Sequence, residues 1–432
     1  MGKKGDFVEV FSKDEVLKGT IISEDSEKLM LKLKNGYNLG LNKKDISKIK
    51  TLEAYKKENM PKEKISENKN LKTILILHCG GTLASKIDYK TGGVSPQFSP
   101  EQISKMFPEL KNVANIKSEL VFQIFSEDLE AEHWQILARK IKNYSEKVDG
   151  IIITHGTDNL AYTSAALSFM LQNLSIPVLV VGAQRSSDRG SSDSSMNLIC
   201  AANFISKSDF AGVAICMHGS INDKYCYILP ACKTRKLHTS RRDAFKSINV
   251  NPIAKVYFKE DKIEFLIKDY KKKNKEKLVL KDKLEKKVAI LKARPGVSVK
   301  ELLFYEKNGY KGLIIEGTGL GHYPILVTDK YTKEHKKALD ALRKMAKKMI
   351  IVMTSSCIFG KVNMDVYKTG RELLDAGIIS GEDMLTETAF VKLSWLLGNY
   401  KDKKEIKNLM RENLAGEIER RIPEYDNNQI FA

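Results

Sequence analysis

The sequence has no long apolar run. Its longest apolar stretches, such as residues 74–77 and 178–181, are far shorter than the roughly 18 residues that a membrane-spanning helix needs. The first residues pass directly into the alternating pattern of residues 7–10, without the apolar stretch and cleavage site of a secretory signal. We therefore expect a chain that does not cross a membrane and stays in the cytoplasm.

Cysteine is scarce, and proline and glycine are not abundant. The 6 cysteines form no CxxC pair and have no histidine at the spacing of a zinc site. They predict small buried residues in a reducing compartment, and no metal centre. With 10 prolines, 27 glycines and 42% hydrophobic residues, the composition is typical of a folded globular protein and excludes a fibrous or disordered one.

Acidic residues are outnumbered by basic ones. The chain has 73 Lys and Arg against 54 Asp and Glu, a net charge of +19. This balance favours contact with polyanions such as RNA, DNA or an anionic membrane surface. Lysine nevertheless alternates with Glu and Asp nearly everywhere, as on ordinary solvated surfaces. The charge by itself leaves both interpretations open.

The chain divides into segments of different pattern. Short alternating runs with turn signals predict a small antiparallel barrel or sheet in residues 1–50, which we assign as a small β-barrel domain, and the polar residues 51–71 predict a linker. Buried strands then alternate with amphipathic helices, which predicts two α/β domains with a mainly parallel, doubly wound sheet. We expect the first domain over residues 72–265 and the second over residues 286–432. Strands are expected at 74–77, 150–154, 178–182 and 213–217, and helices at 129–143, 160–171 and 197–205, with a further helix beginning at Ser99.

Two expected strands end in glycine-threonine turns. Strand 74–77 runs into Gly80-Gly81-Thr82, and strand 150–154 runs into Gly156, Thr157 and Asp158. Because parallel strands end at one edge of a sheet, both turns should meet there. A bare glycine backbone can bind a carboxylate or a developing oxyanion, and a threonine hydroxyl can act as a nucleophile. The alternative is purely structural: an ordinary turn in the first case and helix N-caps in the second.

These turns resemble the signatures of the L-asparaginase type of amidohydrolase, which are close to TGGTIA and HGTDT. Here they read CGGTLA at 79–84 and HGTDN at 155–159. Longer runs resemble the archaeal GatD family of glutamyl-tRNA(Gln) amidotransferase subunits, as does the N-terminal barrel, which simple asparaginases lack. The resemblance spans essentially the whole chain; these runs are DYKTG at 88–92, GAQRSSDR at 182–189, RKLHTSRRD at 235–243 and EGTGLGH at 316–322.

The resemblance implies roles for individual residues. Its catalytic set falls on Thr82 as the nucleophile and on Thr157, Asp158 and Lys236. A desolvated lysine amine gives up its proton readily and would then draw a proton either through Thr157 or from Thr82 directly; the sequence leaves this choice open. The implied substrate-binding residues are Gly81, Tyr89 on a closing loop, and Ser126 and Glu127, which with Asp158 grip the α-amino and α-carboxylate groups.

The chain departs from the family pattern at two positions. Cys79 stands where the family usually has Thr, and we interpret it as a turn residue because the implied nucleophile lies three positions later. Ser356 stands where the GatD family has Gln, which puts the contact from the second domain in doubt.

The resemblance implies a glutaminase subunit. It would hydrolyse L-glutamine, or L-asparagine, through a threonine acyl-enzyme and supply ammonia for converting Glu-tRNA(Gln) into Gln-tRNA(Gln). A GatE-type partner subunit would use ATP and Mg²⁺; this chain has no GxxxxGK[ST] loop and is expected to carry no cofactor. The family implies a homodimer, completed by two partner copies to a heterotetramer. The alternatives are a free-standing cytoplasmic L-asparaginase, which the N-terminal barrel argues against, and a catalytically silent basic scaffold that binds tRNA or the partner.

Overall fold

The protein is described from a computed structural model. The described residues are 2–13, 15–34, 37–55, 68–81, 85–87, 94–96, 103, 106–185, 187 and 190–422. Thr82 and Tyr89, two of the candidate site residues, lie outside them, as does the expected helix start at Ser99.

The N-terminal segment forms one antiparallel sheet of five strands in the order β4-β3-β2-β1-β5. Its core consists of alternating strand residues that point to one side, among them Val8, Val10 and Leu31. The prediction of a barrel is wrong, because no pairing between β4 and β5 closes the sheet among the described residues. Strand β4 is short and its residues are exposed or half-buried, a common arrangement at an open sheet edge. The strands are β1 (Phe7–Ser12), β2 (Val16–Glu24), β3 (Lys28–Leu33), β4 (Asn38–Asn42) and β5 (Ile46–Glu53), with a short 3₁₀ turn η1 (Lys43–Asp45) before β5.

The central domain is built on an eight-stranded sheet in the order β18-β17-β14-β13-β12-β10-β6-β9. Five neighbouring strands are parallel, and the inner ones are buried on both faces, as expected for a sheet covered on both sides. The strands are β6 (Thr73–His78), β9 (Asn115–Leu120), β10 (Gly150–Thr154), β12 (Pro177–Val181), β13 (Gly212–His218), β14 (Tyr225–Pro230), β17 (Ala254–Tyr257) and β18 (Ile263–Phe265).

The predicted parallel character holds for only part of this sheet. Strands β14, β17 and β18 join it in antiparallel pairs, so the sheet is mixed. Only residues 219–224 separate β13 from β14, and a parallel return would need a crossover of about a dozen residues or more. The short connection therefore forces a hairpin.

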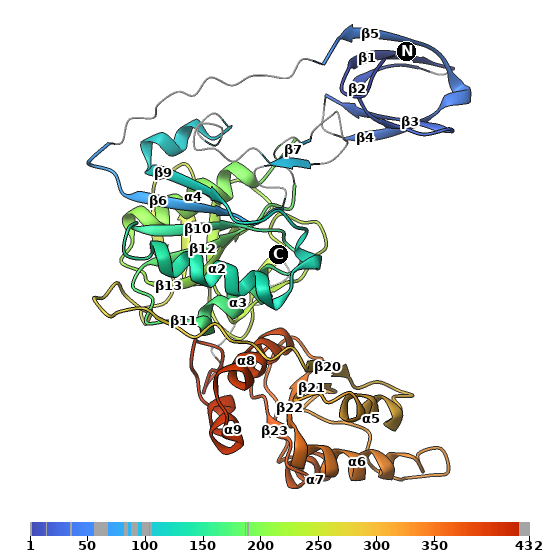
Figure 1. The fold of residues 1–432 in the computed structure, drawn as a ribbon, viewed down its shortest axis with the longest axis vertical. Coiled ribbons are helices and arrows are strands. Elements are labelled where there is room, and N and C mark those ends of the chain that lie inside the picture. The colour runs from blue at the N-terminus through green and yellow to red at the C-terminus, as the bar shows by residue number, and fades with distance from the viewer. Residues whose placement is uncertain are drawn as a thin grey trace.

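Helices cover both faces of the central sheet (Figure 1). Helices α2 (Ala131–Tyr144) and α3 (Leu160–Met170) pack on the face that carries Leu75, Ile151 and Val178. Helix α4 (Ser194–Lys207) packs with Ile103 and the 3₁₀ turn η2 (Pro108–Asn112) on the opposite face. The predicted alternation of strands and helices is confirmed here. No helix among the described residues is long and apolar enough to cross a membrane.

The C-terminal domain has its own parallel sheet in the order β20-β21-β22-β23. Helices α5, α6 and α7 cover one face, and α8 covers the other while it also packs against α3 of the central domain (Figure 1). One core therefore runs through both domains, with Trp395 of α8 stacked on Phe169 of α3 at 5.7 Å between ring centroids. The elements are β20 (Val288–Lys292), α5 (Val299–Lys307), β21 (Gly312–Gly317), α6 (His335–Lys348), β22 (Ile350–Ser355), α7 (Lys368–Asp375), β23 (Ile379–Ser380), α8 (Thr386–Asn399) and α9 (Lys403–Arg411).

Short strand pairs complete the secondary structure of the described residues. The hairpin of β15 (Thr234–Lys236) and β16 (Phe245–Ser247) reaches from the central domain toward the carboxyl ends of the parallel strands. The pair β11 (Leu171–Gln172) and β19 (Val279–Leu280) ties the segment between the domains to the central domain. The backbone of β7 (Ser85–Ile87) and β8 (Val94–Pro96) forms another hairpin.

Candidate active site

The two glycine-threonine turns meet at the carboxyl edge of the parallel strands, as predicted. Beyond β6 the Cys79 N–H donates to Thr154 O at 3.1 Å, and beyond β10 the His155 N–H donates to Val181 O at 2.9 Å. Gly81 has φ +78°, and a Cβ added there would lie 2.7 Å from the backbone N of Gly156. Only glycine allows this approach, so the turns lie backbone against backbone.

A third segment, the 3₁₀ turn η3 (Ser126–Asp128), packs on the same turns. The Asp158 N–H donates to Ser126 Oγ at 3.2 Å, and Asn159 Nδ2 donates to Ser126 O at 2.8 Å. A Cβ on Gly156 would lie 2.8 Å from Ser126 Oγ. Ser126 is buried in this contact, whereas the neighbouring Glu127 is exposed.

The hairpin β15–β16 brings a lysine to the second turn. Lys236 Nζ donates to Thr157 Oγ1 at 2.9 Å and to Asp158 Oδ1 at 2.8 Å. The Lys236 side chain is 16% exposed and the Asp158 side chain 63%. The amine is therefore largely withdrawn from water, with one carboxylate and one hydroxyl as its contacts.

This geometry overturns the interpretation of Thr157 and Asp158 as helix caps. The N-cap of α3 is Asn159, and it makes no side-chain cap hydrogen bond. The side chains of Thr157 and Asp158 contact Lys236 instead. Both residues lie before the helix, with their polar atoms directed at the lysine.

Two histidines at the strand ends support the turns. His155 Nδ1 donates to Gly156 O at 2.6 Å, and its Nε2 accepts from the Thr163 hydroxyl at 2.9 Å. Burial lowers the pKa of His155 to about 4 and that of His78 to about 3. Both rings are therefore neutral near pH 7 and serve as hydrogen-bonding supports.

The two residues that depart from the family pattern, Cys79 and Ser356, lie in different surroundings. Cys79 is buried, and burial raises the pKa of its thiol well above the ordinary value, so the reactive thiolate is suppressed. This agrees with its interpretation as a turn residue. Ser356 is half-buried just after β22, where its N–H donates to Gly317 O at 2.8 Å, and nothing in the described contacts connects it to Lys236.

Gln184 is a site residue that the sequence did not reveal. The Thr157 hydroxyl donates to Gln184 Oε1 at 3.3 Å, so Thr157 lies between Lys236 and this amide. Gln184 follows β12, another parallel strand that ends at this edge, and it lies in the family-like run GAQRSSDR, but neither feature assigned it a role.

Of the eight candidate site residues, five come together: Gly81, Ser126, Thr157, Asp158 and Lys236. Glu127 lies next to them on η3, and Thr82 and Tyr89 lie outside the described residues. No group of three or more His, Cys, Asp or Glu side chains suited to a metal ion occurs in the part of the chain that the structure describes.

Comparisons with known proteins match every large segment of the chain. Residues 73–270 match the family "Asparaginase, N-terminal", residues 287–410 match "Glutaminase/Asparaginase C-terminal domain", and residues 3–52 match "GatD N-terminal domain". Among solved structures, the thermostable L-asparaginase of Thermococcus kodakarensis superposes with a TM-score of 0.71 at 30% identity, over 80% of this chain and 99% of its own. L-asparaginase I of Vibrio cholerae gives 0.69 at 29% identity, over 81% and 99%. The fold and the paired turns define an asparaginase-type α/β protein.

The curated relatives narrow this class. The GatD subunit of the glutamyl-tRNA(Gln) amidotransferase of Pyrococcus furiosus is 47% identical over 91% of this chain and 88% of the relative. That of Methanococcus maripaludis strain S2 is 43% identical over 97% of this chain and 98% of the relative. The chain belongs to the GatD family of glutamyl-tRNA(Gln) amidotransferase subunits.

Proposed function

We propose that this chain is the glutaminase subunit of a Glu-tRNA(Gln) amidotransferase: it hydrolyses the side-chain amide of L-glutamine, or of L-asparagine, and supplies the ammonia. The observation that carries this proposal is the contact of Lys236 with Thr157 and Asp158, beside the turn that leads to Thr82. This contact supports the proposal because an amidase requires a proton acceptor, a hydroxyl and a carboxylate close together.

The reaction begins with attack by the Thr82 hydroxyl on the amide carbonyl of the substrate. Its proton passes to the Thr157 hydroxyl, and that hydroxyl passes its own proton on to Lys236 Nζ, which lies 2.9 Å from Thr157 Oγ1. The amide nitrogen takes up a proton and leaves as ammonia, which leaves an ester on Thr82. Water then hydrolyses this acyl-enzyme and releases glutamate. The backbone N–H groups of the Gly80–Gly81 turn are suited to the oxyanion.

The amino-acid head of the substrate carries an α-ammonium and an α-carboxylate group, so the site needs both hydrogen-bond acceptors and donors. The carboxylates of Glu127 and Asp158, whose segments meet at Ser126, suit an α-ammonium group, and we propose that backbone N–H groups of these turns bind the α-carboxylate. Tyr89 belongs to the proposal as the residue that closes over the substrate. The exposure of Glu127 and Asp158 leaves both available to a ligand.

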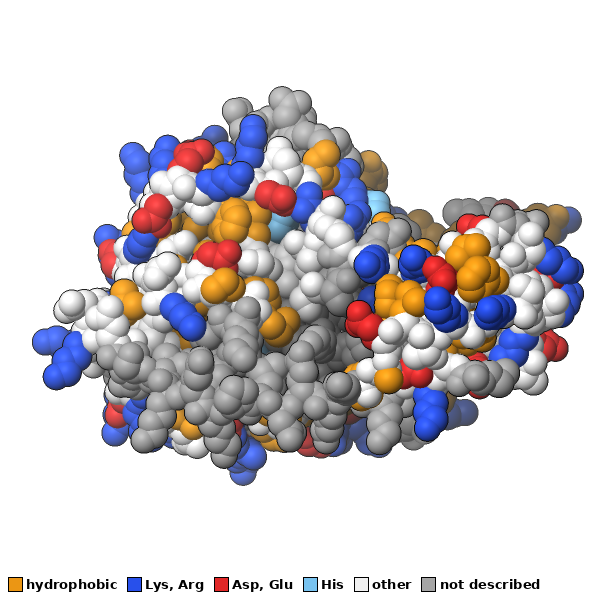
Figure 2. Space-filling view, turned by 90° about the horizontal axis from the view of Figure 1, so that it is seen from above, with side chains coloured by type: hydrophobic (Ala, Val, Ile, Leu, Met, Phe, Trp, Pro, Cys, Tyr) orange, Lys and Arg blue, Asp and Glu red, His pale blue; other side chains and the backbone are white. Residues whose placement is uncertain are grey.

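The partners extend this proposal. The curated relatives are named as one subunit of an amidotransferase, which supports a partner subunit. We propose a GatE-type partner that carries ATP and Mg²⁺ and receives the ammonia. We extend it to a homodimer of this chain, completed to a heterotetramer by two partner subunits, in the cytoplasm. Figure 2 shows basic side chains scattered among acidic ones on the face in view, so contact with tRNA is proposed through the complex.

A free-standing L-asparaginase fits less well. The matches to solved L-asparaginases cover 80% and 81% of this chain but 99% of each asparaginase, whereas residues 3–52 match a domain named for GatD. The five-stranded N-terminal sheet is therefore additional to the asparaginase unit and points to a subunit of a larger assembly.

Ammonia release from L-glutamine and L-asparagine tests the proposal. The purified chain is assayed alone, with the partner subunit, and with the partner and Glu-tRNA(Gln). We expect release from L-glutamine to rise strongly in the complete mixture and to disappear in Thr82→Ala. Vigorous asparagine hydrolysis that neither partner nor tRNA changes would indicate a free-standing asparaginase, and no release in any mixture would indicate a silent scaffold.

A further inference from the structure

The hydroxyl of Thr157 has a contact on each side. Lys236 Nζ lies 2.9 Å from Thr157 Oγ1 on one side, and Gln184 Oε1 lies 3.3 Å from it on the other. A hydroxyl that relays a proton must donate in one direction and accept from the other. The group opposite Lys236 therefore decides which way the Thr157 proton points.

The backbone of Gln184 is fixed by a buried carboxylate. Asp193, the N-cap residue of α4, accepts the N–H of Gln184 at 3.0 Å and that of Arg185 at 2.9 Å. Asn197 Nδ2 donates both to Asp193 Oδ2 and to Gly182 O at 3.0 Å. Asp193 and Asn197 are 0% exposed. The backbone around Gln184 is therefore hydrogen-bonded, at Gly182 and at Gln184 and Arg185, to side chains that water does not reach.

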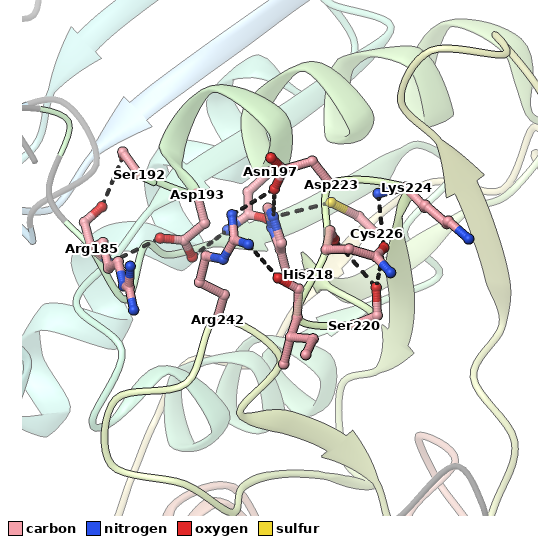
Figure 3. A network of polar contacts seen from close by, with 12 residues as sticks. Arg185, Ser192, Asp193, Asn197, His218, Ser220, Asp223, Lys224, Cys226 and Arg242 are labelled. Carbon is pink, nitrogen blue, oxygen red and sulfur yellow. Dashed lines mark hydrogen bonds and ion pairs between the residues drawn. The ribbon is translucent and has the colours of Figure 1, made fainter. Parts of the chain in front are cut away.

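This network continues away from the site. Because Asn197 Nδ2 faces two acceptors, Asn197 Oδ1 faces His218, whose Nδ1 donates to it at 2.6 Å (Figure 3). Asp223 lies 3.2 Å beyond His218 Nε2, and Arg242 pairs with Asp223. The orientation of the Asn197 amide is set by these contacts, and through Asp193 it sets the position of Gln184.

The free end of the Gln184 amide is unusual. Its Nε2 is buried and has no hydrogen-bond partner among the described residues. A buried donor without an acceptor is costly, and native proteins keep few of them. A half-turn of the amide would exchange Oε1 and Nε2 in the same space, so Thr157 could meet either a hydrogen-bond acceptor or a donor.

We infer that Gln184 is a positioning residue for Thr157 that hydrogen-bonds its hydroxyl in both protonation states of Lys236; this inference rests on the proposed function. With Lys236 as an ammonium group, Nζ donates to Thr157 and the Thr157 hydroxyl donates to Gln184 Oε1. With Lys236 as a neutral amine, the Thr157 proton turns toward it and Gln184 Nε2 donates to the vacated lone pair. A carboxylate at position 184 serves only the first state, and an apolar side chain serves neither.

Two substitutions separate these states. Gln184→Met keeps the length of the side chain but removes the observed bond from Thr157 to Oε1 and the proposed bond from Nε2 to Thr157. The kcat for glutamine should therefore fall about tenfold, with KM within about twofold of the wild type. Gln184→Glu places a carboxylate beside the Thr157 hydroxyl, so the rise of kcat/KM with pH should move to higher pH than in the wild type. The other charged groups near Lys236 are unchanged: Asp158, from the β10–α3 loop, contacts it, Asp193 holds the Gln184 backbone, and Arg235 of β15 pairs with Glu387 of α8 at 3.2 Å.

The assay uses ammonia release by the full chain with its partner subunit and Glu-tRNA(Gln), over a range of pH. Gln135→Met is the matched control, because Gln135 on α2 is also partly buried and donates through Nε2 to Asp282 O at 3.0 Å, outside the site. It should keep the kcat and pH profile of the wild type. If Gln184→Met fails to fold, the isosteric Gln184→Glu carries the test by its pH profile.

The outcomes distinguish the two claims. Wild-type kcat and pH profile in both Gln184 variants, with glutamine still hydrolysed, would overturn the inference alone. No release of ammonia by the wild type, or full activity in Lys236→Met, would overturn the proposed function and the inference with it.

Discussion

Thr157 shows how one side chain acquires a function from its neighbours. A threonine after a parallel strand can cap a helix, and nothing in its immediate sequence opposes that role. Here the cap position falls on Asn159, and the Thr157 hydroxyl meets Lys236 from a segment 79 residues away and Gln184 from another strand end. Its role depends on contacts between three segments.

At the residue scale, the loss of stability on acidification tests whether His155 is neutral in the folded protein. Burial lowers the pKa of His155 to about 4, whereas an unfolded histidine has a pKa of about 6.5. Between these values the unfolded state binds the additional proton, so stability is lost as pH falls through this window, by about 1.4 kcal/mol per pH unit from this one group. His155→Gln should make the loss of free energy of unfolding between pH 6.5 and 4 shallower by that amount, as followed by urea denaturation.

The wild type, denatured in the same buffers, provides the reference slope for this measurement. An identical slope in His155→Gln and the wild type would show that His155 is already charged in the folded protein.

Sequence reasoning reached some of these residues and not others. Thr157 and Asp158 come shortly after an apolar strand and a glycine turn. This pattern predicted both their position and the sheet edge at which they lie. Lys236 lies on a three-residue strand without periodicity, and only the resemblance to a family pointed to it. Gln184 was missed although it lies in the family-like run at 182–189, because the run does not show which side chain the amide meets; its role comes from Thr157, 27 residues earlier.

At the element scale, the site depends on two turns that touch through their glycines. Gly81 has φ +78° and lies against the backbone of Gly156, whereas Gly296 has φ +76° with no atom near an added Cβ. Gly81→Ala should lower kcat at least a hundredfold, because the turns must separate and the reacting groups move apart. Gly296→Ala carries the same backbone strain, about 1 kcal/mol, and should keep full activity.

The comparison of these two alanine variants isolates the contact between the turns. Ammonia release measures activity, and thermal unfolding measures the cost of strain. Equal loss of activity in both variants would assign the effect to backbone strain, and full activity in Gly81→Ala would show that the turns need not touch.

The elements also show where pattern reasoning reaches its limit. Strand and helix positions in the central domain followed from apolar periodicity and were close to the observed ones: the strand predicted at 150–154 is β10, and the helix predicted at 160–171 is α3. The N-terminal segment was assigned as a closed barrel although it is an open sheet, and the antiparallel strands β14, β17 and β18 were not predicted. Both depend on which strands pair, and apolar periodicity does not specify partners.

At the scale of the whole molecule, a buried ion pair fastens the lysine-bearing hairpin to the C-terminal domain. Lys233, just before β15, pairs with Asp383, and both side chains are 0% exposed. Lys233 Nζ also donates to Asp383 O at 2.9 Å, and Asn249 Nδ2 donates to Gly360 O at 2.9 Å beside it. The position of Lys236 therefore depends on how the two domains are joined.

Removal of this lysine should be costly. Lys233→Met leaves the Asp383 carboxylate buried without its cation, and we expect a loss of about 3–5 kcal/mol in the free energy of unfolding. Adding Asp383→Asn should recover part of the loss, because the uncompensated charge is gone. Chemical denaturation measures both variants.

The exposed pair of Lys337 and Glu334 serves as the control, with side chains 64% and 67% exposed. Lys337→Met should cost at most a few tenths of a kcal/mol. A similarly small loss in Lys233→Met would contradict the role of the buried pair in joining the domains.

The central claim is that this chain produces ammonia for amidation of a tRNA-bound glutamate, and transfer of labelled nitrogen tests it most directly. The complex of this chain with its partner receives Glu-tRNA(Gln), ATP and glutamine labelled with ¹⁵N in the side-chain amide, and the label in the tRNA-bound product is measured by mass spectrometry. We predict that the wild type transfers the label, that Lys236→Met loses at least a hundredfold of this transfer, and that added ammonium restores product formation in the variant. Undiminished transfer from glutamine in Lys236→Met, or a failure of ammonium to restore the product, would contradict the account.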